Sequence, residues 1–118
     1  MANTIPTDIT LHKQSKKLAV TYDGQAYLLS AEFLRVHSPS AEVRGHGPGQ
    51  ETLQIGKEQV GIDQIEPVGH YAIKIFFDDG HDSGLYSWDY LYELATQQDA
   101  MWQDYLNRLT QAGHQRQI

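Results

Sequence analysis

The segment from Phe76 to Leu91 carries the signals of four consecutive elements of secondary structure. It continues an alternating apolar strand pattern, and its Asp79-Gly80 dipeptide accepts the positive φ of a tight turn at low energetic cost. Ser87 is a good helix N-cap, and Asp89 falls in the first turn, where the helix dipole favours an anion. The segment therefore predicts a strand, a turn, a short strand and a helix, which is typical of a mixed α+β domain.

The first third of the chain predicts three antiparallel strands. Apolar and polar residues alternate over residues 9–12 and 18–22, and a polar turn with three lysines joins the two segments. Asp23-Gly24 then favours a second turn, and residues 25–29 return as a third strand. We expect an antiparallel meander.

A short helix and a long loop follow. Ser30 is an N-cap candidate, and the helix should end before Pro39 because the residue before proline avoids helical geometry. Residues 37–51 are mostly Ser, Pro, Gly, His and charged types, which predicts irregular structure.

The second half of the sheet is less regular. Residues 52–55 and 60–65 flank a plausible turn, and broken alternation in the second of them suggests a bulge. Pro67 argues for an edge strand or a strand end, because proline cannot donate to a sheet ladder. Residues 71–77 give the clearest strand of the chain, with alternating faces.

The C-terminal third predicts one kinked helix or two helices. Apolar residues recur at helical spacing before and after a polar break at residues 97–99, and Gly113 ends the pattern. We expect one domain over residues 1–118, with a core of about 9–112 and a flexible tail at 113–118. The predicted fold is α+β: a bent antiparallel β-sheet meander, a short helix after the third strand, and a C-terminal helix or helix pair packed on the sheet.

Composition limits the function. The 118 residues contain no cysteine, which removes thiolate nucleophiles and every zinc site that relies on Cys. The formal net charge of −6 repels phosphate backbones, so we expect no nucleic acid partner for this acidic protein. No apolar run is long enough for a membrane helix and no signal peptide is evident, so we expect a cytoplasmic protein that binds no membrane.

Histidines and arginines give the candidate binding residues. Arg35, His37, Arg44 and His46 fall in or beside the long loop, where cationic groups among glycines can hold a carboxylate or phosphate. The alternative is a mobile surface connection, since the glycines are also explained by turn geometry. The six histidines show no metal-ligand spacing.

His81 allows several interpretations. It is either a simple turn residue or a member of the binding surface, and it is a weak candidate metal ligand. A Ser-His-Asp relay can be assembled from Ser83, His81 and Asp79, but such short loops do not orient the chain of hydrogen bonds that catalysis needs. The aromatic residues Trp88, Tyr92, Trp102 and Tyr105 favour core packing over a stacking platform.

Two segments resemble a known family. They are residues 34–47 and 71–91, and the second contains Asp-Gly-His-x-Ser-Gly-x-Tyr-x-Trp from Asp79 to Trp88. The chain resembles the gamma-butyrobetaine hydroxylase-like N-terminal domain family, formerly a domain of unknown function, over about residues 9–109. In carnitine-pathway hydroxylases this domain precedes an iron- and 2-oxoglutarate-dependent catalytic part. We expect a stand-alone, bacterial-type member that lacks it.

The resemblance also implies a zinc site that this chain should not retain. The family's structural zinc is held by three Cys and one His, whose positions fall here on Ser38, Ser40, Val43 and His81. Serine hydroxyl is a poor substitute for thiolate at zinc, so we expect no metal and no cofactor.

The expected function is a non-catalytic binding or adaptor domain with a protein partner, and not an enzyme, because similar domains accompany different catalytic partners, among them iron-sulfur cluster carrier ATPases. The candidate surface comprises residues 35–50 and 79–83, with Arg35, His37, Arg44, His46 and His81 as contacts. Exposed edge strands also allow a homodimer. Two alternatives stay open: a metal-binding accessory protein in iron or iron-sulfur metabolism or for an oxygenase partner, and a quaternary-amine sensor with an aromatic cage.

Overall fold

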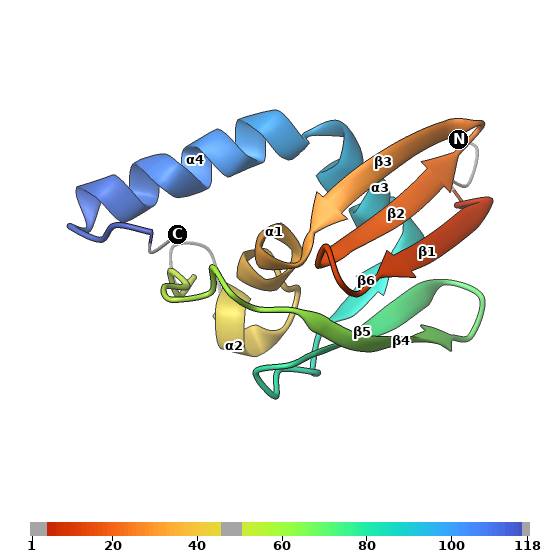
Figure 1. The fold of residues 1–118 in the computed structure, drawn as a ribbon, viewed down its shortest axis with the longest axis horizontal. Helices are drawn as coiled ribbons and strands as arrows, with labels where there is room; N and C mark the ends of the chain where they lie inside the picture. Colours follow the sequence, from red (N-terminus) through yellow and green to blue (C-terminus); the bar gives the residue numbers. More distant parts are fainter. Residues whose placement is uncertain (1–4, 46–50, 117–118) are drawn as a thin grey trace.

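The computed structural model describes residues 5–45 and 51–116 (Figure 1). Within these ranges the fold is α+β, as predicted. The elements run in the order β1 (Asp8–His12), β2 (Lys17–Tyr22), β3 (Gln25–Ser30), α1 (Ala31–Val36), α2 (Ala41–Arg44), β4 (Ile62–Val68), β5 (Ala72–Phe77), β6 (Leu85–Ser87), α3 (Trp88–Thr96) and α4 (Gln98–Gln111).

The first sheet is the predicted meander, in the order β1-β2-β3 with antiparallel pairing throughout. In the central strand β2, Leu18 and Val20 are fully buried, so period-two alternation does face one side to the core. The β2–β3 turn places Asp23 at φ 49° and Gly24 at φ 79°, the left-handed geometry that this dipeptide tolerates.

The second sheet has the order β4-β5-β6 and is also antiparallel. Its register shifts between Ile62 and Gln64, which confirms the predicted bulge. Pro67 lies in β4, which is an edge strand. Its missing N–H therefore does not interrupt the hydrogen bonding of a central strand. The clearest predicted strand is the central one, β5.

The strands form two three-stranded sheets rather than one bent sheet. In Figure 1, β1 and β4 lie beside each other, yet the sheet pairing among the described strands stops at each of them. The chain leaves the first sheet through Ser30, which directly caps α1, and it enters the second only at Ile62. Two helices and an irregular segment intervene, so no hairpin links the sheets.

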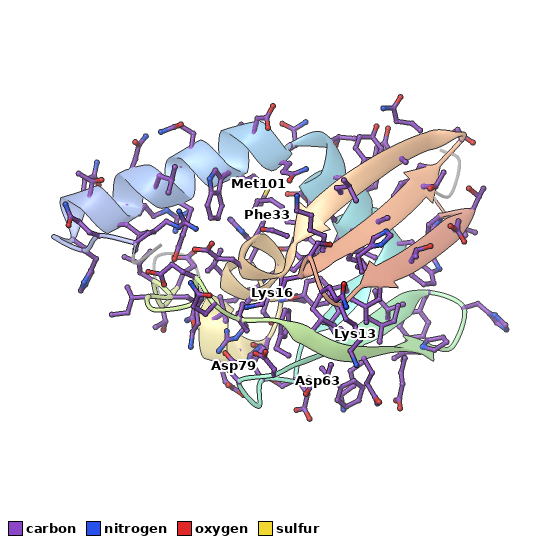
Figure 2. The ribbon with its side chains drawn as sticks, viewed as in Figure 1. Lys13, Lys16, Phe33, Asp63, Asp79 and Met101 are labelled. Atoms are coloured by element: carbon purple, nitrogen blue, oxygen red, sulfur yellow. The ribbon has the colours of Figure 1, made fainter. Side chains whose placement is uncertain are left out.

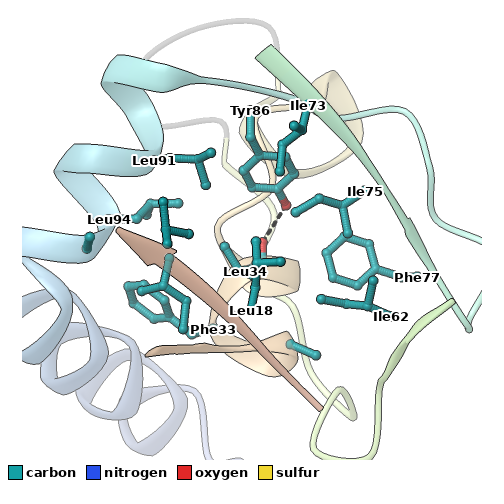
Figure 3. Close-up of a cluster of buried hydrophobic side chains, with 14 of the residues drawn as sticks. Leu18, Phe33, Leu34, Ile62, Ile73, Ile75, Phe77, Tyr86, Leu91 and Leu94 are labelled. Carbon is teal, nitrogen blue, oxygen red and sulfur yellow. Dashed lines mark hydrogen bonds between the residues drawn. The ribbon is translucent and has the colours of Figure 1, made fainter. Parts of the chain in front are cut away.

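The core fills the space between the two sheets, α1 and α3 (Figure 3). Leu18, Leu34, Ile75 and Leu91 are fully buried there, and each such side chain contributes about 1.5–3 kcal/mol relative to exposure. Tyr86 is equally buried, and its hydroxyl donates to the Leu34 carbonyl oxygen at 2.6 Å, the dashed line in Figure 3. The core thus ties β6 to α1.

The C-terminal third is a helix pair broken at Gln97, one of the two predicted forms. The Ser87 hydroxyl accepts the Tyr90 N–H at 3.1 Å, as expected of an N-cap. Leu94 of α3 is fully buried, whereas Tyr92, which the spacing placed on the buried face, is 39% exposed. In Figure 2, Met101 of α4 faces Phe33 of α1.

Two local predictions are wrong. Residues 41–44 of the supposedly irregular loop form α2, whose first turn closes through the Ser40 carbonyl oxygen. Residues 52–55 were predicted as a strand but pair with no strand. The Thr52 N–H donates instead to the Val43 carbonyl oxygen at 2.8 Å, and the Gln54 carbonyl oxygen accepts from the Tyr105 hydroxyl at 2.7 Å. Tertiary partners replace sheet partners for this segment.

Candidate functional site

A buried polar cluster joins the turn after β5 to the segment after α1. His81 is 6% exposed, and its Nε2 lies 2.8 Å from Oγ of Ser38 and 3.3 Å from Oγ of Ser40. Ser38 Oγ also accepts the Ser40 backbone N–H at 3.3 Å. We call Ser38, Ser40 and His81 the His81 cluster. Its hydrogen bonds connect residues 43 positions apart in the sequence.

The other ring nitrogen of His81 faces Glu42. Nδ1 lies 3.3 Å from Oε2 of Glu42, but the contact lacks the direction of a hydrogen bond, and Nδ1 is buried without another partner. Burial lowers the pKa of His81, and the Arg35 guanidinium lowers it further, while Glu42 and Asp79 act in the opposite direction. The ring is therefore neutral near pH 7.

Gly84 allows the backbone of this turn to approach the cluster closely. A Cβ at position 84 would lie 2.4 Å from Oγ of Ser38 and 3.1 Å from Cδ of Pro39. Any side chain there would displace the segment after α1. The glycine of the Ser83-Gly84 pair is thus explained by packing.

An ion pair closes the same turn from the other side. Arg35 Nε donates to Oδ2 of Asp79 at 2.8 Å, and Lys57 Nζ lies 3.5 Å from the same oxygen. The second carboxylate oxygen accepts the His81 backbone N–H at 3.1 Å. Burial opposes ionisation of Asp79, but the His81 N–H, Arg35 and Lys57 together lower its pKa. Arg35 is paired with Asp79 and only 8% of its side chain is exposed, so it does not present its charge to a partner.

A small pocket of about 80 Å³ lies between α1, α2, residues 51–54 and α4. We call it the Arg44 pocket, and its polar lining includes His37, Arg44, Glu51, Tyr90 and Arg108. The Arg44 guanidinium lies over the Tyr90 ring, 4.6 Å from its centroid.

His37 is not the cationic group of this pocket. Its Nδ1 lies 3.0 Å from the Phe33 carbonyl oxygen, an acceptor, so Nδ1 carries the proton. Burial lowers the pKa of His37, an effect that the Phe33 carbonyl opposes and Arg108 reinforces. The positive charge comes from Arg44 and Arg108 instead.

The four family zinc positions do not suit zinc here. The structure does bring Ser38, Ser40 and His81 together, but two hydroxyls and one imidazole lack the thiolates such a site requires, and Val43 offers only carbon. His81 Nε2 is already engaged by both hydroxyls. Within residues 5–45 and 51–116, no three His, Asp or Glu side chains gather as a metal site would need.

The relay of Ser83, His81 and Asp79, which the short loops made improbable, does not form. The Ser83 hydroxyl donates to Glu42 at 3.0 Å, and Asp79 contacts the His81 backbone rather than its ring. Two serines do contact the ring, but Ser38 is fully buried and Ser40 is 6% exposed, so neither offers an accessible nucleophile.

Four of the five predicted contact residues separate into two groups. Arg35 and His81 are buried and hold the loops together, whereas His37 and Arg44 line the Arg44 pocket. His46 lies outside the described residues. Sequence reasoning missed Tyr90 and Arg108 at this pocket. Tyr90 lies within the second family segment, residues 71–91, but Arg108 has no local signal beyond its pairing with Asp104 one helical turn earlier.

Comparisons with known proteins agree with this fold. The family model described as gamma-butyrobetaine hydroxylase-like, N-terminal, matches residues 9–92. Two solution structures solved by NMR are similar to the chain. The first is 58% identical with a TM-score of 0.86, and the match covers 98% of this chain and 91% of that one. The second is 49% identical with a TM-score of 0.81, and the match covers 97% of this chain and 86% of that one. No curated protein matches.

A third similar structure comes from Acidithiobacillus ferrooxidans ATCC 23270, a crystal structure at 1.93 Å of a protein of unknown function in the DUF971 family. It is 36% identical, with a TM-score of 0.62, and covers 76% of this chain and 91% of that one. With the family model matching well over half of its residues, the chain belongs to the gamma-butyrobetaine hydroxylase-like N-terminal domain family.

Proposed function

We propose that this domain is a non-catalytic binding module whose Arg44 pocket receives an acidic side chain of a protein partner. The observation that carries the proposal is the pocket itself, which Arg44 and Arg108 both line and in which Arg44 lies over the Tyr90 ring. Its volume of about 80 Å³ is well below the roughly 300–1,000 Å³ of drug-sized ligand sites. A single carboxylate-bearing side chain fits this volume better than a cofactor does.

The charges in the lining favour an anion. Two guanidinium groups and one carboxylate, that of Glu51, line the pocket. Arg108 is already paired with Asp104, so the proposal depends mainly on the charge of Arg44. A guanidinium binds a carboxylate through two parallel hydrogen bonds, which gives direction as well as attraction. The Tyr90 ring holds the Arg44 guanidinium in place from one side, so less side-chain freedom is lost on binding.

The non-catalytic part of the proposal is supported by how the reactive side chains are used. Ser38 and His81 are buried and hydrogen-bonded to each other. Arg35 and Asp79 form an ion pair. These groups fasten the turn after β5 to the segment after α1, and His37 and Ser38 of that segment line the pocket. Four other interpretations stay predictions: a metal-binding accessory protein, a quaternary-amine sensor, a homodimer and a cytoplasmic location. None of the helices described is long and apolar enough to span a membrane.

The test compares two variants of equal charge change. Arg44→Ala removes a pocket guanidinium, whereas Lys13→Ala removes an exposed cation from the β1–β2 turn. We expect affinity capture from the native cell, followed by mass spectrometry, to recover a partner with wild type and Lys13→Ala and to lose it with Arg44→Ala.

A second arm identifies the acidic group. Each Asp and Glu of the captured partner is changed to Asn or Gln, and we expect one such change to reproduce the loss caused by Arg44→Ala. If Arg44→Ala retains every protein that wild type captures, the pocket is not the binding site.

A further inference from the structure

A second polar site lies between α1 and α4, where Arg116 folds back from the segment that follows α4. Its Nε donates to Oε2 of Glu32 at 2.9 Å, and its Nη2 donates to Oε1, so the pair is bidentate. The guanidinium carbon also lies 5.2 Å from the centre of the Trp102 ring. The chain therefore holds its own arginine between a carboxylate and an aromatic face.

The carboxylate of this site belongs to a buried helix. Glu32 belongs to α1, all six residues of which are buried, and its side chain is only 9% exposed. A cavity of about 310 Å³ surrounds it, lined by Ser30, Glu32, Phe33, Gln98, Asp99, Trp102 and Arg116. Phe33 and Trp102 pack edge to face at 6.3 Å, which fixes the ring that the cation covers.

The segment that carries Arg116 is held more weakly than Glu32 is. Gly113, His114 and Gln115 are all exposed, and Gly113 turns the chain at φ 80°. The His114 N–H still donates to the Leu109 carbonyl oxygen at 2.9 Å. The exposed residues bury little apolar area, so the segment is held mainly through Arg116, which contacts Glu32 and Trp102 and is also attracted by Glu58.

We propose that Glu32 and Trp102 form a binding site for a guanidinium group, which Arg116 fills in this structure and which accepts an arginine side chain of a protein partner when that segment is displaced. The geometry selects guanidinium over ammonium, because the planar fork matches both carboxylate oxygens and also stacks on the ring. Since Glu32 is buried, the site exchanges one cation for another instead of standing empty. It is separate from the Arg44 pocket.

Chemical rescue tests the site directly. In Arg116→Ala, n-propylguanidinium replaces the missing side chain, and n-propylammonium at the same ionic strength is the matched control. We expect the midpoint of thermal unfolding to rise saturably with n-propylguanidinium only. The indole N–H signal of Trp102 should shift in NMR spectra, while that of Trp88, which donates to the His70 carbonyl oxygen at 2.7 Å, stays unchanged.

The double variant Glu32→Gln/Arg116→Ala keeps the cavity and removes the carboxylate, so it should show no rescue. If Arg116→Ala alone is unfolded, the folded fraction measured by circular dichroism replaces the unfolding midpoint, and n-propylguanidinium should restore it. Equal rescue by n-propylammonium, rescue that survives Glu32→Gln, or an unmoved Trp102 signal each overturns the proposal.

A peptide arm addresses the partner. An arginine-containing peptide should bind Arg116→Ala, and its citrulline counterpart, which lacks the charge, should not. Wild type should bind the same peptide about tenfold more weakly or worse, because its own Arg116 occupies the site most of the time. Equal binding by wild type and Arg116→Ala would show that the peptide uses another surface.

Discussion

The His81 cluster and the Glu32–Arg116 pair both fasten distant segments, but by different physics. The first joins residues 43 positions apart through neutral groups enclosed in the core, and the second joins residues 84 positions apart through opposite charges near the surface. Breaking the first link leaves a buried hydroxyl or a buried ring nitrogen without its hydrogen-bond partner. Breaking the second leaves one buried carboxylate, which another cation can satisfy. The buried hydrogen bonds of the His81 cluster have no alternative partner. The carboxylate of Glu32, in our proposal, can exchange Arg116 for the arginine of a partner.

The largest expected effect comes from His81→Ala. It removes a buried ring that packs against Phe77 and leaves both cluster hydroxyls without that partner, so we expect the free energy of unfolding to fall by about 3 kcal/mol. Denaturant unfolding measures it. The control is His12→Ala on exposed β1, expected within about 0.5 kcal/mol of wild type. Equal losses in both variants would mean that the His81 cluster is not a structural link.

Arg116→Ala should have a smaller effect, about 1–3 kcal/mol, because it leaves Glu32 without its partner but near solvent. The matched control is Arg108→Ala, whose pair with Asp104 is more than half exposed and contributes about 0.3–0.5 kcal/mol. Denaturant unfolding at low and high salt compares the two. A loss no larger than that of Arg108→Ala would contradict the contrast drawn between the links.

The smallest expected effect is a dependence on pH, which separates the neutral link from the charged one. The folded pKa of His81 is below the ordinary 6.5, so the unfolded chain binds more protons and stability falls as pH drops below 6.5 toward that folded value. The loss is complete once both states are protonated. His37 adds a fall of the same sign.

His81→Gln, which cannot titrate, should show a shallower fall over this range, whereas Arg116→Ala should keep the wild-type slope. The measurement is denaturant unfolding from pH 7.5 downward. It stays above the acid range in which Asp79, whose pKa is lowered below 3.8, begins to contribute. An unchanged slope in His81→Gln would mean that the ring is not held neutral.

Local signals predicted most of the elements but not how they pair. The alternation in β2 and β5 and the caps at Ser30 and Ser87 depend on residues within one or two turns, and the structure confirms them. The division into two sheets was not predicted, because it depends on where residues 31–61 carry the chain. Residues 52–55 look like a strand but find their partners on α2 and α4.

The candidate sites follow the same rule. The sequence showed that Arg44 stands in a loop able to hold an anion, yet the Arg108 that joins it in the pocket comes from a helix 64 positions later. It also gave Arg35 and His81 as candidate contacts, but both are buried and serve as structural links.

Neighbouring residues and one continuous motif are enough to predict the α+β class, the starts of α1 and α3, the strand turns and the family. Only the tertiary structure decided which polar groups are enclosed, which are paired and which line a pocket. Those properties depend on packing between segments far apart in the chain, as for Ser38 with His81 and Glu32 with Arg116.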